Sequence, residues 1–158
     1  MNEIKNKYLV FTIEKEQFAI SLPLVQEVIS YQPIYPLYDV SSYLKGVINL
    51  RGKIIPVLDL RLKFGLPEVA YTERTIFIII NLESENQSSL LGLVVDSVKD
   101  VITLDESEIQ QPHEIGFKFK SKYIHGIAQY HDDVVIILDI QKILTTEEII
   151  ELHEQIKE

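Results

Sequence analysis

The sequence contains neither cysteine nor tryptophan. The absence of cysteine excludes disulfides, thiolate metal sites and cysteine nucleophiles. Long apolar runs are also missing: the longest, 76–80 and 134–138, have five residues each, whereas a membrane-spanning helix needs about twenty. The N-terminal segment lacks the apolar core of a signal peptide. These absences suit a reducing compartment, and we expect a soluble cytoplasmic protein without direct membrane insertion.

Basic residues are few, with 15 Lys and Arg against 24 Asp and Glu and a formal net charge of −9. That charge repels phosphate backbones and anionic lipid, which disfavours nucleic acid and acidic membranes as partners. The four histidines show no metal-ligand spacing, and no phosphate-binding loop or nucleophile elbow is present. We therefore expect no catalytic residues, no metal and no cofactor, and a protein that acts by binding.

The most ordered pattern lies at 43–66 and predicts a strand, a tight turn, a second strand and one helical turn. The strands are expected at Leu44–Leu50 and 54–58, around a turn at 51–53. Asp59 is expected to cap the helical turn and Gly65 to follow its end. Arg51 is a long cation on this turn between two apolar strands. It is either a solvated turn residue or a group placed to reach a carboxylate on another protein.

A degenerate copy of this pattern lies 80 residues further on, at 123–144, without a gap over 22 positions. The identical pairs are Tyr43/Tyr123, Gly46/Gly126, Leu58/Leu138 and Asp59/Asp139. Earlier in each copy, 18–30 matches 91–103 with an offset of 73. Two strand-rich halves can look alike by chance, but the gapless match favours two homologous units. At roughly 60–70 residues each unit would be marginal alone, so the two should share an apolar interior.

The predicted fold class is mostly β, with about five strands per unit that close as a barrel to avoid exposed edges. Further strands are expected at 8–13, 18–22, 75–82 and 90–95, with a polar turn at 83–89 and an amphipathic stretch at 96–104. At 24–30 a helical turn and a strand compete. Residues 145–148 fit a capping box and predict an amphipathic C-terminal helix over 146–157. That helix either docks on the barrels or binds a partner.

Residues 49–66, NLRGKIIPVLDLRLKFGL, resemble the signature of the CheW family of bacterial chemotaxis coupling proteins. So do YLVFTI at 8–13, LVQEVI at 24–29, LGLVVDSVKDVI at 91–102 and the closing YIHGI…VVIILDIQKIL. The resemblance covers about 7–155. It implies one CheW-like domain over 1–158, built from two intertwined SH3-like five-stranded β-barrels with short helices. The expected units lie near 8–66 and 75–144. A coupling protein without attached receiver or kinase domains is expected, unlike CheV-type and CheA-type members.

The resemblance also implies a function, that of a non-catalytic adaptor. Such an adaptor couples the cytoplasmic tips of methyl-accepting chemoreceptors to the regulatory domain of the histidine kinase CheA, and it is recruited to membrane receptor arrays. By position in the motifs, the receptor-binding residues are Val25, Glu27, Arg51 and Ile76. The kinase-binding residues are Asp96, Val98 and Val101. An adaptor of a pilus-motility or other non-flagellar pathway remains open. The alternatives of other classes are an oligonucleotide-binding barrel and an enzyme with a pocket of titratable groups.

Overall fold

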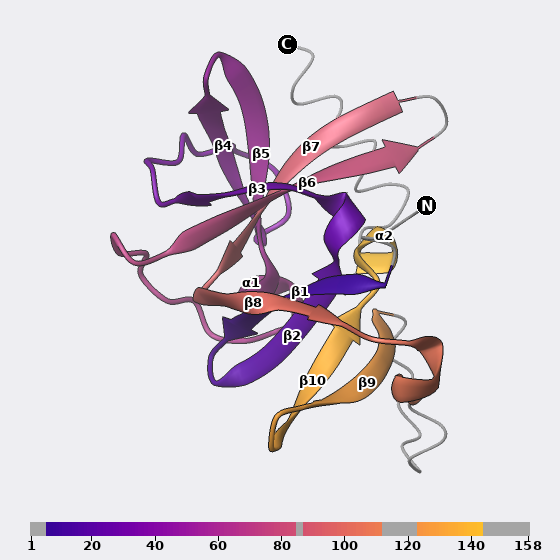
Figure 1. Ribbon diagram of the computed structural model, residues 1–158. Helices are drawn as coiled ribbons and strands as arrows, with labels where there is room; N and C mark the ends of the chain where they lie inside the picture. The colour runs from indigo at the N-terminus through magenta and orange to yellow at the C-terminus, as the bar shows by residue number, and fades with distance from the viewer. Residues whose placement is uncertain (1–5, 85–86, 112–122, 144–158) are drawn as a thin grey trace. The chain divides into compact units, whose positions relative to one another are not determined.

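The computed structural model describes residues 6–84, 87–111 and 123–143. Antiparallel and parallel strands dominate this part of the chain, and its helices are single turns (Figure 1). The strands are β1 Lys7–Ile13, β2 Glu16–Ser21, β3 Val25–Ser30, β4 Leu44–Leu50, β5 Lys53–Asp59, β6 Ile76–Ser84, β7 Gln87–Val95, β8 Ser97–Thr103, β9 Ile124–Tyr130 and β10 Asp133–Leu138. The helical turns are η1 Leu22–Leu24, α1 Leu60–Lys63, η2 Glu106–Glu108 and α2 Ile140–Ile143.

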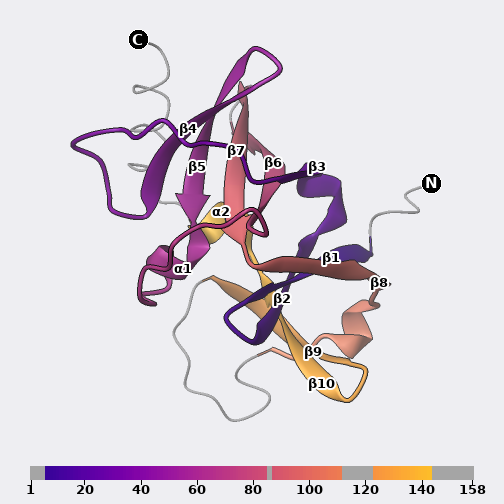
Figure 2. The same cartoon turned by 90° about the vertical axis from the view of Figure 1, so that its left-hand side faces the viewer.

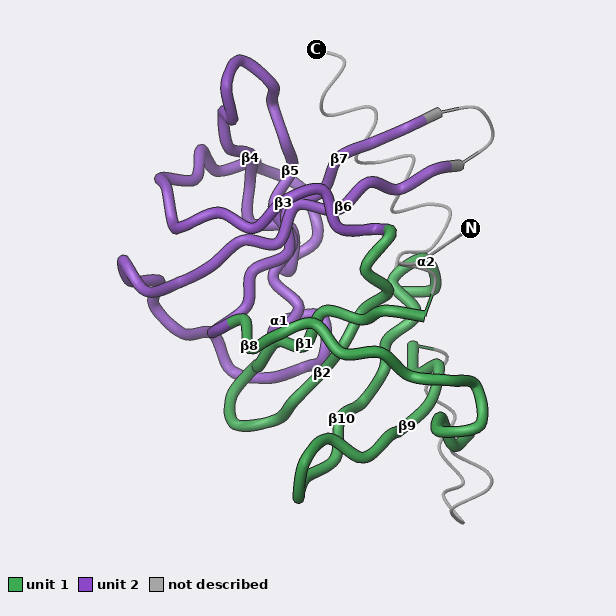
Figure 3. The backbone as a smooth tube through the Cα atoms, in the orientation of Figure 1, with its two compact units in different colours: residues 1–23, 98–145 green, residues 24–97, 146–158 purple. Residues whose placement is uncertain are grey.

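The strands form two five-stranded sheets, in the orders β8-β1-β2-β10-β9 and β3-β6-β7-β5-β4. Each sheet belongs to one compact unit (Figure 3): of the described residues, unit 1 contains 6–23, 98–111 and 123–143, and unit 2 contains 24–84 and 87–97. Within each sheet one parallel pair joins two antiparallel hairpins: β10 with β2 joins β9–β10 to β1–β2, and β5 with β7 joins β4–β5 to β6–β7. The predicted mostly β fold with two five-stranded units is confirmed.

The two sequence repeats exchange their first hairpins. The β1–β2 hairpin joins β8, β9 and β10 of the second repeat, whereas the β6–β7 hairpin joins β3, β4 and β5 of the first. The expected units near 8–66 and 75–144 are therefore sequence repeats, and each supplies strands to both compact units. This exchange is what makes the units intertwined.

Each sheet is closed by the segment that follows its edge strand (Figure 2). Tyr35, beyond the end of edge strand β3, pairs with Val47 on the opposite edge strand β4. Gln110, beyond β8, pairs in the same way with Ile127 on β9. These bridges satisfy backbone groups that an open edge would leave unpaired and so close each sheet as a barrel.

Barrel closure explains why Gly46 and Gly126 occur in both repeats. A Cβ atom built on Gly46 would lie 2.2 Å from the backbone oxygen of Tyr35, and one on Gly126 would lie 2.3 Å from Cγ2 of Ile109. The closing segment thus passes directly over each glycine. Gly46 also has φ +146°, a conformation that side chains of L-residues rarely adopt.

The repeat seen in the sequence is present in the backbone. In both copies a seven-residue strand is followed by a two-residue turn, a second strand and a one-turn helix. The N–H of Asp59 donates to the carbonyl of Tyr43 at 2.8 Å, and that of Asp139 donates to Tyr123 at the same distance. Both copies also have a bulge at equivalent places, beside Gly46 and beside Gly126.

Each unit has an apolar cluster of its own, made mainly by strand residues at alternating positions; in unit 1, Leu104 and Ile109 join it from the segment after β8. In unit 1 the buried members are Tyr8, Val10, Ala19, Leu104, Ile109, Ala128, Val135 and Ile137. In unit 2 they are Ile48, Ile55, Val57, Phe77, Ile79 and Val94. These clusters fix the barrels from which the hairpin turns project.

The sequence placed several boundaries incorrectly. The polar segment 83–89 was expected to be a turn, but Leu82 pairs with Ser89 and Glu83 with Ser88, so β6 and β7 extend across most of it. Polar residues are tolerated there because the pairing satisfies the backbone. At 24–30 the strand β3 forms, preceded by the turn η1, and the amphipathic stretch 96–104 contains the strand β8. The predicted C-terminal helix over 146–157 lies outside the described residues.

Candidate functional site

The β4–β5 hairpin of unit 2 places Arg51 at its tip. Leu50 pairs with Lys53, so the turn contains only Arg51 and Gly52, one residue fewer than expected. Both turn residues have positive φ, 52° and 88°, which is the geometry that matches the twist of a two-residue hairpin. The side-chain oxygen of Asn49 accepts the N–H of Gly52 at 3.0 Å and holds the turn. The backbone thus fixes the direction in which Arg51 leaves the sheet.

Arg51 makes an ion pair with Glu27 on β3. One guanidinium nitrogen, Nη2, lies 2.7 and 2.6 Å from the two carboxylate oxygens. The side chains of Arg51 and Glu27 are 68% and 30% exposed, so the pair lies at the surface. The hydrogen bond to Glu27, together with its charge, raises the pKa of Arg51. Two residues 24 positions apart in the sequence therefore form one ion pair. The sequence predicted a receptor-binding role for each of them but did not predict their contact.

The ion pair borders a pocket of about 170 Å³ in unit 2. Its walls combine charged groups of the turn and of β3 with apolar side chains of the sheet: Glu27, Leu50, Arg51, Lys53, Ile79 and Leu90. Val28, the residue after Glu27, is 43% exposed, and Ile54, on the strand that follows the turn, is 49% exposed, although neither lines the pocket. A pocket wall that combines charged and apolar groups suits a protein interaction surface. The strand pattern did not identify Ile54, because an apolar strand residue is usually a core residue.

The other two predicted receptor-binding residues lie on the same sheet. Val25, at the start of β3, is half-buried and pairs with Ile80 of β6. Ile76, at the start of β6, is half-buried and pairs with Ser30 at the other end of β3. Glu27 lies opposite Ile79. Three residues of extended strand separate Ile76 from that position, a distance of about 10 Å. The structure therefore brings Glu27 and Arg51 into contact and does not place Ile76 beside them.

A buried polar network of unit 2 supports α1. Asp59, 1% exposed, accepts the N–H of Arg61 at 2.8 Å and the hydroxyl of Tyr71 at 2.5 Å. This confirms Asp59 as the N-cap of α1, and the hydrogen bonds of Gly65 and Leu66 to Leu62 and Arg61 confirm the glycine-terminated end. Burial first, and then the hydrogen bond to Asp59, raises the pKa of Tyr71.

Asp96, one of the predicted kinase-binding residues, belongs to this network. Its carboxylate lies 2.5 Å from Nη2 of Arg61, whose side chain is 9% exposed, while Asp96 itself is 40% exposed. A nearly buried guanidinium needs a partner, so this ion pair has a structural role in unit 2. The predicted binding role of Asp96 therefore applies to a carboxylate already bonded within its own unit.

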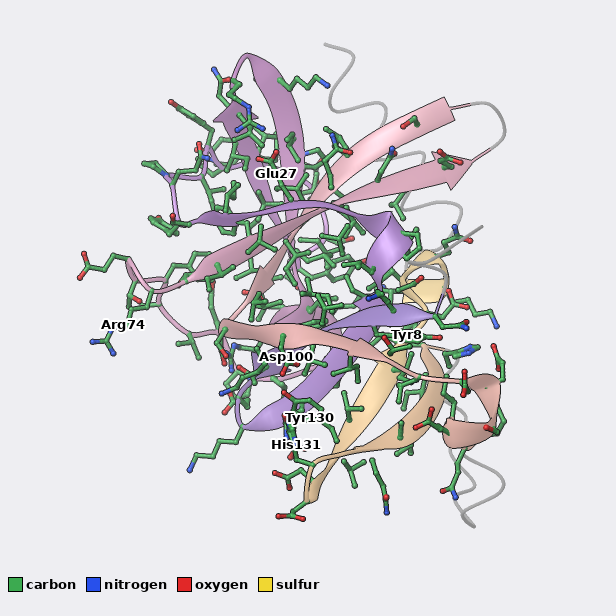
Figure 4. The ribbon with its side chains drawn as sticks, in the orientation of Figure 1. Tyr8, Glu27, Arg74, Asp100, Tyr130 and His131 are labelled. Carbon is green, nitrogen blue, oxygen red and sulfur yellow. The ribbon has the colours of Figure 1, made fainter. Side chains whose placement is uncertain are left out.

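The remaining predicted kinase-binding residues lie on β8 in unit 1. Val98 is half-buried, whereas Val101 is 45% exposed. Between them, Asp100 accepts the hydroxyl of Tyr130 at 2.9 Å on each of its carboxylate oxygens. Figure 4 shows Asp100 on β8 close to Tyr130 and His131 at the end of the β9–β10 hairpin. The sequence singled out neither Tyr130 nor Asp100 for a joint role, although the offsets of the repeat align them with Leu50 and Glu27.

Among residues 6–84, 87–111 and 123–143 no cluster of three or more potential metal-binding side chains occurs. Two of the four histidines, His113 and His153, lie outside this described part. Of the two that are described, His131 contacts the ring of Tyr130, with 4.4 Å between ring centroids. No helix in the described segments is long and apolar enough to cross a membrane.

Comparison with known proteins gives a consistent result over nearly the whole chain. The family model of the CheW-like domain matches residues 7–148. The chemotaxis protein CheW of Bacillus subtilis is 35% identical over 147 residues, which covers 92% of this chain and 92% of that protein. The chemotaxis protein CheW of Klebsiella aerogenes is 33% identical over 145 residues, which covers 92% of this chain and 85% of that protein.

A solved structure supports the same relationship. The scaffolding protein TtCheW of Thermoanaerobacter tengcongensis superposes with a TM-score of 0.73 at 32% identity, covering 85% of this chain and 89% of that one. The two closed sheets and the extent of both sequence and structural matches lead to one conclusion. The chain belongs to the CheW family of chemotaxis scaffold proteins.

Proposed function

We propose that this protein is a non-catalytic adaptor that couples chemoreceptors to the histidine kinase CheA and is recruited by them to membrane receptor arrays. The observation that carries the receptor side is the Arg51–Glu27 pair, held on a two-residue turn at the border of a pocket that also has apolar walls. Val25, on the same strand as Glu27, extends this surface, and Ile76 marks its far end on β6.

The pair changes how Arg51 is expected to act. Nη2 already bonds both oxygens of Glu27, so Arg51 presents its remaining donors and the pair approaches neutrality as a unit. A receptor helix bundle that contacts this surface then meets a planar polar group at the border of a pocket with apolar walls. Such a surface favours a partner with a polar acceptor flanked by aliphatic residues over a strongly acidic one.

The surface that binds the kinase is proposed to consist of Val98 and Val101 on β8 and of Asp96, the residue before β8. Exposed Val101 is the member of this set that offers apolar area directly, because Val98 is half-buried and Asp96 is bonded to Arg61. A barrel-to-barrel contact through this strand would bury valine surface. Each Å² buried contributes about 25 cal/mol to the free energy of binding, from which the costs of association are subtracted.

The receptor assignment is tested with charge reversals at the two ends of the ion pair. Arg51→Glu and Glu27→Arg each place like charges face to face, and each should lower binding to a receptor cytoplasmic fragment by about tenfold or more. The double variant with both changes restores the attraction, so partial recovery of binding is expected. Binding is measured by co-sedimentation with receptor fragments, and thermal denaturation checks the fold of every variant.

Lys142→Glu is the matched control, because it makes the same charge change at an exposed position of unit 1. It should bind receptor normally. The reciprocal variant is Val101→Glu, which should weaken binding to the CheA regulatory domain and leave receptor binding intact. Equal receptor binding by Arg51→Glu, Glu27→Arg and the unmodified protein would refute the assignment.

A further inference from the structure

Unit 1 has a pocket at the place that corresponds to the Arg51 pocket of unit 2. The unit 1 pocket measures about 490 Å³, against about 170 Å³ in unit 2. Its hairpin residues Tyr130, His131 and Asp133 stand 80 positions after Leu50, Arg51 and Lys53, which line the other pocket. An offset of 73 likewise relates Lys99 to Gln26 and Leu90 to Gln17. The two pockets therefore occupy the same position in two copies of one fold.

A carboxylate occurs at this position in both copies, whereas the arginine that binds it in unit 2 is replaced by a histidine in unit 1. Glu27 and Asp100 are related by the offset of 73, and in unit 2 the turn residue Arg51 binds Glu27. In unit 1 the turn residue is His131, which has the same left-handed conformation, with φ 58° against 52° for Arg51. Within the described residues, Asp100 is bonded to the neutral hydroxyl of Tyr130. The shorter residue at the turn accompanies the larger pocket.

We propose that the unit 1 pocket binds the guanidinium group of an arginine that a partner protein presents to Asp100. The internal precedent is the Arg51–Glu27 pair, which shows that this part of the fold positions a guanidinium against a carboxylate. Asp100 keeps acceptor capacity, since a carboxylate offers about four lone-pair sites and Tyr130 supplies one proton. The ring of Tyr130 adds an aromatic face on which a guanidinium can stack.

The charges around the pocket restrict the kind of partner. Two carboxylates, of Glu14 and Asp133, and two ammonium groups, of Lys15 and Lys99, line the pocket, and Asp100 adds a third carboxylate through its bond to the lining residue Tyr130. This balance leaves one net negative charge, which a single cation neutralises. Val101 and Val134, 45% and 54% exposed, are the counterparts of Val28 and Ile54; they lie outside the pocket lining but on the strands β8 and β10, where they offer apolar surface. The expected partner therefore presents a single arginine among aliphatic residues. The proposal depends on neither the receptor assignment of Arg51 nor the kinase assignment of Val101.

The test uses the full chain and a short probe, the acetylated and amidated tripeptide Val-Arg-Val. Its matched control has citrulline in place of arginine, which keeps the shape and removes the charge. Titration followed by two-dimensional amide NMR should shift resonances of β8 and of 130–133 at millimolar peptide. The citrulline peptide should bind about tenfold more weakly, because it loses the charge-assisted hydrogen bonds.

Two variants decide whether Asp100 and the turn are responsible. Asp100→Asn should weaken binding of the arginine peptide by about tenfold. Asp132→Asn, which removes a carboxylate from the β9–β10 turn instead, should leave that binding unchanged. His131→Arg supplies the missing guanidinium from within the chain, so it should abolish probe binding while the thermal midpoint is maintained. Equal binding of both peptides, unchanged binding by Asp100→Asn, or shifts confined to the Arg51 hairpin would overturn the proposal. Self-association of the free chain through the same residues would overturn the assignment to a different protein.

Discussion

The hairpins β4–β5 and β9–β10 are copies with the same strands, the same bulge and the same positive φ at the first turn residue. They differ in the groups they present. At one tip a guanidinium is bonded to Glu27, and at the other an imidazole lies against the ring of Tyr130. Positions that close the barrel are kept in both copies, whereas positions at the tip have diverged. Barrel closure and the groups exposed at the tip therefore depend on different residues of the same fifteen-residue stretch, 44–58 in the first copy.

The largest difference in stability between the copies is expected when Gly46 and Gly126, over which the closing segments pass, are each replaced by alanine. Gly46→Ala places a methyl group 2.2 Å from a backbone oxygen at φ +146°, and should cost about 3 kcal/mol or more in the free energy of unfolding. Gly126→Ala meets a side-chain methyl of Ile109 and has no left-handed φ, so about 1–2 kcal/mol is expected. Chemical denaturation measures both. Equal costs would mean that closure does not depend on the backbone contact at Gly46.

A smaller difference is expected between the two aspartates that precede the short helices. Asp59 is buried and accepts bonds from Arg61 and Tyr71, whereas Asp139 is 30% exposed and lies 3.8 Å from Nζ of Lys142. Asp59→Ala leaves buried donors without an acceptor and should cost about 2–3 kcal/mol. Asp139→Ala should cost about 0.5–1 kcal/mol. The denaturant midpoints of the two variants at neutral pH measure this difference. A midpoint for Asp59→Ala equal to or above that of Asp139→Ala would mean that the network around Asp59 is dispensable.

The smallest effect appears only at alkaline pH and involves Tyr71. Its folded-state pKa is raised above 10, so above pH 10 the unfolded chain loses this proton while the folded chain keeps it. Stability then falls as pH rises, by at most about 1.4 kcal/mol per pH unit, lowered by solvent screening because the ring is half-buried. Tyr71→Phe should be less stable at neutral pH and should lose less stability between pH 10 and 11. Parallel pH profiles for the two proteins would show that Tyr71 does not titrate in this way.

Sequence periodicity and turn chemistry predicted the repeat well. The strand Leu44–Leu50, the cap at Asp59 and the glycine after α1 were placed correctly because each depends on local rules: alternation, side-chain capping and left-handed φ. The strand β3 was ambiguous, because LVQEVI satisfies both a helical and an extended pattern. Its pairing with β6, which is far away in the sequence, decides the outcome.

The candidate site was harder to predict than the fold. Arg51 and Glu27 were each identified, but their contact requires β3 to reach the turn of another hairpin, and no local pattern reports that. Arg61 illustrates the opposite problem. It looks like an exposed residue of a short helix, yet it is 7% exposed and bonded to Asp96. Which charged groups are buried is decided by tertiary packing, so sequence reasoning assigned Asp96 a surface role alone.

The exchange of hairpins between the repeats has a consequence for assembly. Residues 6–66 contain one hairpin for unit 1 and three strands for unit 2, and residues 76–143 contain the reverse. The single chain therefore has the topology of a domain-swapped dimer whose two half-chains are joined by a covalent linker. Neither half-chain holds a complete sheet, so each half needs the other as its template. A homodimer of one half-chain would therefore have had the same fold before two copies were fused into one chain.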